Sequence, residues 1–267
     1  MTDFGVTADF LPARLGVTGR FEDGRLFMDA VPMPETLSHG VLRASVLAYA
    51  VDSVAGIVVD DDPDSWSMTS DLSLRMLAQP ARERITASAT VVRRGRRSSS
   101  CTVDLVDHEG TPAGSGVASF VRYPRRDGDP PKPDITPQRI PSIMGHLIPL
   151  DRPLREAAGI EVLNAPGGIV QVEVTPELRN PAGTLQGAMV ALVAESAAEE
   201  LIQSRFSVPA VVTDLDVRYL AQAPAGPVRT RCEVTGDGPD ASVLVELTDI
   251  TQDVVTTLAY ARATPLG

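Results

Sequence analysis

Basic residues are in short supply in this chain of 267 residues. Its 24 Lys and Arg residues stand against 35 Asp and Glu residues, which leaves a formal net charge of −11. A chain this acidic is repelled by phosphate backbones and by anionic lipid, so we expect neither a nucleic-acid partner nor a membrane partner. An anionic ligand would need a local cluster of cations.

Cysteine, histidine and aromatic residues are also rare. The two cysteines, Cys101 and Cys232, cannot form a disulfide framework, and the three histidines are too scattered for a zinc cluster, so we predict no metal site. Aromatic residues make up 4% of the chain. A ligand pocket is therefore expected to be lined by Leu, Val, Met and Ala.

Long apolar runs are missing as well. No stretch is long enough to span a bilayer, and the first ten residues lack the basic and apolar regions of a secretory leader. Hydrophobic residues make up 43% of the chain and charged residues 22%, which is typical of a packed globule. These features predict a soluble, cytoplasmic protein.

An internal repeat is the strongest feature that the sequence does contain. Residues 71–79 read DLSLRMLAQ and return as DLDVRYLAQ at residues 214–222, 143 positions later. The same offset aligns residues 16–79 with residues 159–222 without a gap. A constant offset through predicted turns, helix and strands indicates two copies of one fold, each of roughly 120 residues.

A proline-rich segment separates the two copies. Eight prolines lie between residues 124 and 153, where they fix φ, remove hydrogen-bond donors and favour an extended chain. We therefore predict two domains, residues 1–123 and 154–267, joined by a linker over 124–153. The linker is expected to cross the first domain and to have no chemistry of its own.

Each copy shows the same predicted order of elements. A strand at 25–31 or 168–174 precedes one long helix at 41–59 or 184–203. Alternating apolar residues in the first copy then predict strands at 68–77, 84–92, 98–106 and 114–122. The pattern indicates an α+β fold in which a twisted antiparallel sheet wraps around one long central helix.

The second copy carries a motif at the start of its predicted helix. Residues 180–188 read NPAGTLQGA, and Glu195 follows Gly187 by eight positions. This resembles the hotdog-fold acyl-CoA thioesterases of the phenylacetate-degradation (PaaI-like) and 4-hydroxybenzoyl-CoA type, whose motif is N-x-x-G-x-x-H-G-G followed by an acidic residue. Gln186 replaces the histidine, and the second glycine of the pair is absent. The resemblance covers both copies and implies a double hotdog.

The resemblance also implies a division of labour between the copies. In that family one hotdog unit supplies an Asn amide and a glycine N–H that stabilise an oxyanion. Its partner supplies an acid, which activates water or attacks the thioester carbonyl directly, together with a hydroxyl. Asn180 and Gly187 of the second copy match the first set, and Asp52 and Thr69 of the first copy match the second. Glu195 is the other candidate acid.

The opposite pairing has lost these groups. By the repeat offset, Leu37 and Ala44 occupy the positions of the Asn and the Gly, and Val212 occupies the hydroxyl position beside Glu195. We therefore expect one working composite site and one decayed site. An acid on an apolar helix can also have a purely structural role, and this alternative is most open for Glu195.

A basic hairpin is the candidate site for the phosphates of coenzyme A, which is part of the implied substrate rather than a separate cofactor. Four arginines flank Gly95, and arginine suits bidentate contacts with phosphate. A solvated hairpin that only aids solubility is the alternative. The four residues are Arg93, Arg94, Arg96 and Arg97.

The implied function is hydrolysis of an acyl- or aryl-CoA thioester. A non-catalytic acyl-CoA-binding or sensor protein on the same scaffold is the alternative, because the motif is incomplete. A hotdog dehydratase would need a catalytic histidine, and His39 aligns beside the turn glycine rather than at the motif histidine. We expect a homo-oligomer, since hotdog sheets expose edges and faces that usually pair.

Overall fold

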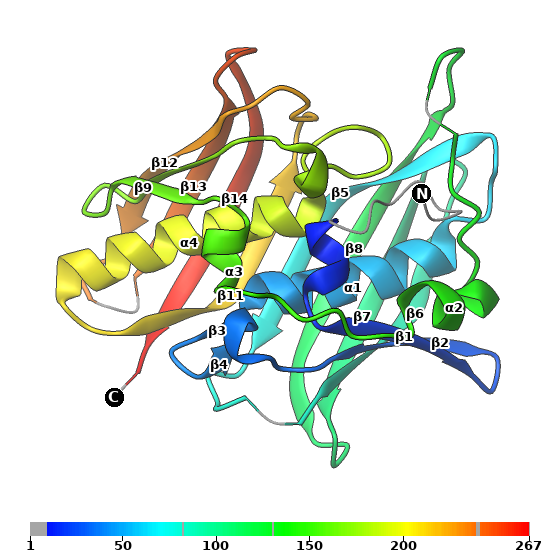
Figure 1. Cartoon of the computed structure of the whole chain (residues 1–267), viewed down its shortest axis with the longest axis horizontal. Helices are drawn as coiled ribbons and strands as arrows, with labels where there is room; N and C mark the ends of the chain where they lie inside the picture. Colours follow the sequence, from blue (N-terminus) through cyan, green and yellow to red (C-terminus); the bar gives the residue numbers. More distant parts are fainter. Residues whose placement is uncertain (1–9, 82, 130, 239–240, 267) are drawn as a thin grey trace.

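The structure, a computed structural model, describes residues 10–81, 83–129, 131–238 and 241–266 (Figure 1). The outermost residues of the two predicted domains, 1–9 and 267, lie outside this range. The first half of the chain contains, in order, η1 (Leu11–Arg14), β1 (Val17–Glu22), β2 (Arg25–Ala30), η2 (Pro34–Thr36), β3 (Leu37–Ser38), β4 (Val41–Leu42), α1 (Ala44–Val59), β5 (Ser65–Met76), β6 (Ile85–Arg94), β7 (Ser98–Asp107) and β8 (Pro112–Pro124).

The second half repeats this order after a connecting segment. The connection contains η3 (Pro137–Arg139), α2 (Ile140–Met144) and α3 (Leu154–Ala157). The elements that follow are β9 (Glu161–Asn164), β10 (Ile169–Val172), η4 (Pro176–Leu178), α4 (Gly187–Phe206), β11 (Ala210–Tyr219), β12 (Val228–Thr235), β13 (Ser242–Asp249) and β14 (Val254–Pro265).

The described strands form one twelve-stranded antiparallel sheet in the order β1-β2-β6-β7-β8-β5-β11-β14-β13-β12-β10-β9, with β3 and β4 paired separately. Counted outward from the centre, the first half runs β5-β8-β7-β6-β2-β1 and the second half runs β11-β14-β13-β12-β10-β9, so equivalent strands occupy equivalent places. The two halves are therefore related by an approximate twofold axis between β5 and β11.

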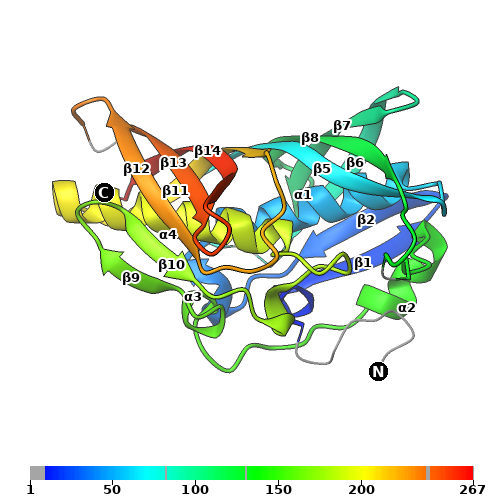
Figure 2. The ribbon, with the colours of Figure 1, turned by 90° about the horizontal axis from the view of Figure 1, so that it is seen from above.

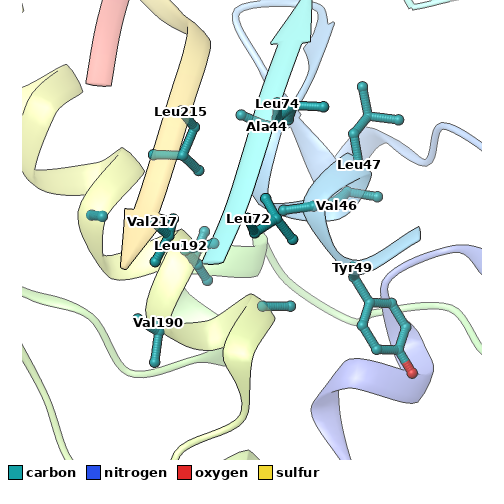
Figure 3. Packing of buried hydrophobic residues seen from close by; sticks show 14 of the residues in the cluster. Ala44, Val46, Leu47, Tyr49, Leu72, Leu74, Val190, Leu192, Leu215 and Val217 are labelled. Carbon is teal, nitrogen blue, oxygen red and sulfur yellow. The ribbon is translucent and has the colours of Figure 1, made fainter. Parts of the chain in front are cut away.

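The repeated segment itself forms this centre. In the pairing of β5 with β11, Ser73 lies opposite Asp216, which is its equivalent under the repeat offset. On the inner face, Leu72 and Leu74 lie opposite Val217 and Leu215 (Figure 3). All four side chains are at most 1% exposed, so one apolar core continues from one half into the other.

The two long helices lie on the same face of the sheet. Figure 1 shows α1 and α4 running outward from the middle of the molecule, and Figure 2 shows the sheet curving over them. Both are rich in buried Ala, Val and Leu. Buried residues lie around most of the circumference of each helix, which is typical of a helix that is enclosed by the rest of the protein.

Both helices begin three residues later than the sequence predicts. Val41 and Leu42 continue the helical spacing of apolar residues, but they pair with Leu37 and Ser38 as a short hairpin. In the second half, Arg179 makes the corresponding isolated bridge to Leu185. Two strands that the sequence analysis missed, β1 and β9, lie at the two edges of the sheet.

The connection between the halves is docked rather than extended throughout. Ile140 of α2 is fully buried against β1, where a Cβ added to Gly19 would lie 2.0 Å from Ile140 Cγ2. Glycine is therefore required for this close approach. Earlier in the connecting segment, Lys132 Nζ donates to Asp60 at 2.7 Å and to the carbonyl of Ser65 at 2.9 Å, which ties this part of the segment to the first half. None of the described helices is long and apolar enough to cross a membrane.

Candidate active site between the two halves

A tight turn leads the chain into α4. Asn180 Oδ1 accepts a hydrogen bond from the Thr184 N–H at 3.2 Å, and Gly183 adopts a φ of +84°, which glycine tolerates without strain. Gln186 then caps the helix by accepting the N–H of Ala188 at 2.6 Å. The residue that replaces the motif histidine thus serves as a helix cap, and Asn180 keeps its amide nitrogen as a donor.

Gly187 is the first residue of α4. Its N–H lies at a helix N-terminus, where the helix dipole favours negative charge, and none of the residues that the structure describes accepts a hydrogen bond from it. Its carbonyl accepts a hydrogen bond from the hydroxyl of Tyr219 at 3.1 Å. Gly187 therefore combines an N–H donor at the helix start with a carbonyl that is fixed by Tyr219.

Asp52 is held by Thr69. The Thr69 hydroxyl donates to Asp52 Oδ1 at 2.6 Å, from β5 to α1. The pairing of β5 with β8 shifts register between Thr69 and Asp71, and such a bulge turns a strand and re-aims its side chains. Burial raises the pKa of Asp52 to about 6, while the hydrogen bond from Thr69 acts in the opposite direction.

Tyr219 connects the two sides of this region. Burial raises the pKa of its phenol, and the charge of Asp52 raises it further. The same hydroxyl bonds to the carbonyl of Gly187. Tyr219 therefore links Asp52 and Thr69 of the first half to Gly187 of the second. The sequence analysis did not select Tyr219; its only signal was a difference between the repeats, since Met76 stands at the equivalent position.

Glu195 lies on the other side of the approximate twofold axis and caps α1. Its Oε1 accepts the N–H of Ala44 at 2.8 Å, and its Oε2 accepts the N–H and the hydroxyl of Ser45 at 3.2 and 2.6 Å. Arg43 lies 3.9 Å from Glu195 and donates to Glu199 at 3.0 Å. All these side chains are buried.

The two acids thus have different surroundings. Ala44 is the equivalent of Gly187, and its N–H is already bound to the carboxylate of Glu195. Burial raises the pKa of Glu195 to about 7, and Arg43 and the Ser45 donors oppose this. Asp52 is one methylene shorter and bonds to Thr69 instead. Among the residues that the structure describes, the N–H of Ala44 has a carboxylate acceptor and the N–H of Gly187 has none.

Comparison with known proteins agrees with this architecture. The family described as the acyl-CoA thioesterase C-terminal domain matches residues 13–118. A protein of unknown function with a hot dog fold from Alicyclobacillus acidocaldarius is 14% identical, with a TM-score of 0.60 over 98% of this chain and 99% of that one. Residues 13–118 are thus similar to an acyl-CoA thioesterase family, and the likeness to the solved structure shows a hotdog fold.

Two further structures resemble this chain over most of its length. An acyl-ACP thioesterase from Bacteroides thetaiotaomicron is 14% identical, with a TM-score of 0.59 over 89% of this chain and 97% of that one. A 12:0-ACP thioesterase from Umbellularia californica is 11% identical, with a TM-score of 0.57 over 90% and 98%. At these identities the likeness shows the fold. No curated protein matches the chain.

The arginine hairpin lies at the turn between β6 and β7. Its four arginine side chains are exposed. Arg94 forms an ion pair with Asp61 and donates to the carbonyl of Val58 at 3.0 Å. Val58 follows Asp52 by six residues, about 9 Å along a helix axis. The hairpin is therefore tied to the C-terminal end of the helix that carries Asp52.

The surroundings of Glu195 predict a structural role. Glu195→Ala leaves two backbone N–H groups of α1 without their acceptor and leaves Arg43 with Glu199 alone, which we expect to lower the free energy of unfolding by about 2–4 kcal/mol. Urea denaturation followed by circular dichroism measures the loss. Glu233→Ala removes an exposed glutamate and serves as the control, with an unchanged midpoint. Equal midpoints for both variants and the wild type would contradict the role.

Proposed function

We propose that this protein is a thioesterase that hydrolyses acyl- or aryl-CoA thioesters to the free acid and coenzyme A. The observation that carries the proposal is the Asp52–Thr69 pair of the first half, whose charge affects Tyr219, the residue that binds the first residue of α4 in the second half. The match of residues 13–118 to an acyl-CoA thioesterase family supports it. In this proposal residues 1–123 and 154–267 are two hotdog units, and one composite site lies between them.

The chemistry follows from the charge that develops on the substrate. Gly187 N–H and the Asn180 amide would donate to the carbonyl oxygen, which becomes an oxyanion when the carbonyl carbon is attacked. Asp52, oriented by Thr69, would take a proton from an attacking water or attack the carbon itself. On the base route, collapse of the intermediate breaks the C–S bond, releases the acid and passes the proton from Asp52 to the thiolate of coenzyme A. On the nucleophilic route, collapse expels the thiolate and leaves an acyl–Asp52 anhydride, which water hydrolyses to the free acid and Asp52, and the proton released goes to the thiolate.

The raised pKa of Asp52 suits this role. A carboxylate that titrates near pH 6 is ionised at neutral pH and is a stronger base than an ordinary aspartate. Glu195 is placed in the second, decayed site of the proposal, because its oxygens bind the first turn of α1. Two structural neighbours are named for acyl-ACP, so acyl-ACP is included as a substrate in the test.

A non-catalytic acyl-CoA-binding or sensor protein is the second candidate. Gln186, which replaces the histidine of the family motif, is used as a helix cap. Release of free thiol from an acyl-CoA separates the two candidates, because a binding protein leaves the thioester intact. We also propose that the protein self-associates, and sedimentation at several concentrations tests this.

Removing the charge at Asp52 tests the site directly. In Asp52→Asn we expect kcat for acyl-CoA hydrolysis to fall at least about 100-fold, since a general base contributes this much or more. The matched variant Glu195→Gln is expected to keep kcat within about fivefold. A thiol-reactive dye with a panel of acyl-CoA and acyl-ACP substrates measures both. Loss of activity in Glu195→Gln with full activity in Asp52→Asn would overturn the assignment.

The pH dependence follows from the same group. Activity needs the ionised form of Asp52, so kcat/KM should rise with pH through a midpoint near 6. Thr69→Val removes a donor that favours the ionised form, so the midpoint should move to higher pH. Thr213→Val, at the equivalent bulge in the second half, is the control and should leave the midpoint in place. An unchanged pH midpoint in Thr69→Val would show that the Asp52–Thr69 pair does not control the reaction.

The arginine hairpin is proposed to bind the phosphates of coenzyme A. The double reversal Arg93→Glu and Arg96→Glu spares the Arg94–Asp61 pair and should raise KM for acyl-CoA about tenfold or more at low salt, with less effect at high salt. Arg231→Glu changes an exposed arginine of the other half and is the control. An unchanged KM in the double variant would remove the hairpin from the binding site.

A further inference from the structure

Tyr219 is one of the positions near the site at which the two repeats differ in chemical character. It is the last residue of β11, and its equivalent at the end of β5 is Met76. In the half that carries Met76, the N–H of Ala44 is bound by Glu195. In the half that carries Tyr219, the equivalent N–H of Gly187 has no such carboxylate on it.

The phenol lies directly against the start of α4. Its hydroxyl donates to the carbonyl of Gly187 at 3.1 Å. A Cβ built on Gly187 would lie 3.3 Å from the phenol oxygen and 3.6 and 3.7 Å from Cζ and Cε1 of the ring. Tyr219 therefore covers the first residue of the helix and holds its carbonyl at the same time.

The orientation of one peptide plane affects the neighbouring donor. The hydroxyl of Tyr219 ties the carbonyl of Gly187 to β11, and β11 is paired with β5, which carries Thr69. The carbonyl of Gly187 and the carboxylate of Asp52 are therefore both held by residues of the same sheet, Tyr219 and Thr69. The phenol remains a donor at all physiological pH values, because burial and the nearby Asp52 raise its pKa.

We propose that Tyr219 is a positioning and specificity-determining residue of the thioester site. Its hydroxyl aligns the first residue of α4, so that the N–H of Gly187 meets the substrate carbonyl oxygen. Its ring forms the wall beside the carbonyl carbon and excludes acyl groups that are branched next to the thioester. This role rests on the thioesterase function proposed above.

Two variants separate the hydroxyl from the ring. Tyr219→Phe removes only the hydrogen bond, and we expect kcat to fall about tenfold for every acyl-CoA while KM stays the same. Tyr219→Met substitutes the residue that the first half carries and opens space beside Gly187. We expect the ratio of kcat/KM for 2,2-dimethylpropanoyl-CoA to kcat/KM for butanoyl-CoA to rise about tenfold.

Controls distinguish this role from a structural one. Tyr260→Phe alters an exposed tyrosine on β14 and should leave both kinetic constants and the acyl preference unchanged. A purely structural Tyr219 would lower the melting temperature and leave the acyl preference unchanged, and that result would overturn the proposal. Wild-type kcat in Tyr219→Phe would overturn the positioning role in the same way.

A binding measurement keeps this test independent of hydrolysis. The probes are thioether analogues of the same two acyl-CoAs, which cannot be hydrolysed, and calorimetry measures their Kd for wild type, Tyr219→Met and Tyr260→Phe. We expect Tyr219→Met alone to improve the relative affinity for the branched analogue. If wild type releases no thiol from any substrate, the thioesterase proposal fails, and this affinity ratio still decides the case: an unchanged ratio overturns the role of Tyr219.

Discussion

The pairing of β5 with β11 is the interaction on which the rest of the molecule depends. It joins two six-stranded halves into one sheet and sets the twofold relation between them, because Ser73 lies opposite its own equivalent, Asp216. On the outer face, Arg75 reaches Asp214 and Arg218 reaches Asp71, both at 3.1 Å. These exposed ion pairs add little energy, and the buried leucines and valines beneath them supply the cohesion.

That pairing also places the N-terminal halves of the two helices alongside each other. Each helix start then faces an acid from the middle of the other helix, so two equivalent sites arise from one geometry. The length of the acid makes the two sites different. A glutamate reaches the N–H of Ala44 and closes its site, whereas Asp52 stops short and is held by Thr69. A difference of one methylene thus separates a helix cap from an acid that is available to a ligand.

Much of the fold could be predicted from the sequence because its elements are long and strongly patterned. The two long helices and the central strands repeat their apolar spacing at a constant offset. The starts of the helices were predicted too early, because Val41 and Leu42 have the right spacing for the helix but pair as a hairpin. The edge strand β9 is exposed along its whole length, so no alternation marks it.

The amino-acid sequence is enough to identify two copies of one fold, the residue types at each helix start and the copy that keeps Asp52 and Thr69. These features follow from a constant repeat offset, which pairs equivalent positions without knowledge of their contacts. The carboxylate that binds a helix N–H and the side chain that covers Gly187 are known only from the folded molecule. Those contacts join residues far apart in the chain, and they depend on how the register of β5 and β11 brings the helices together.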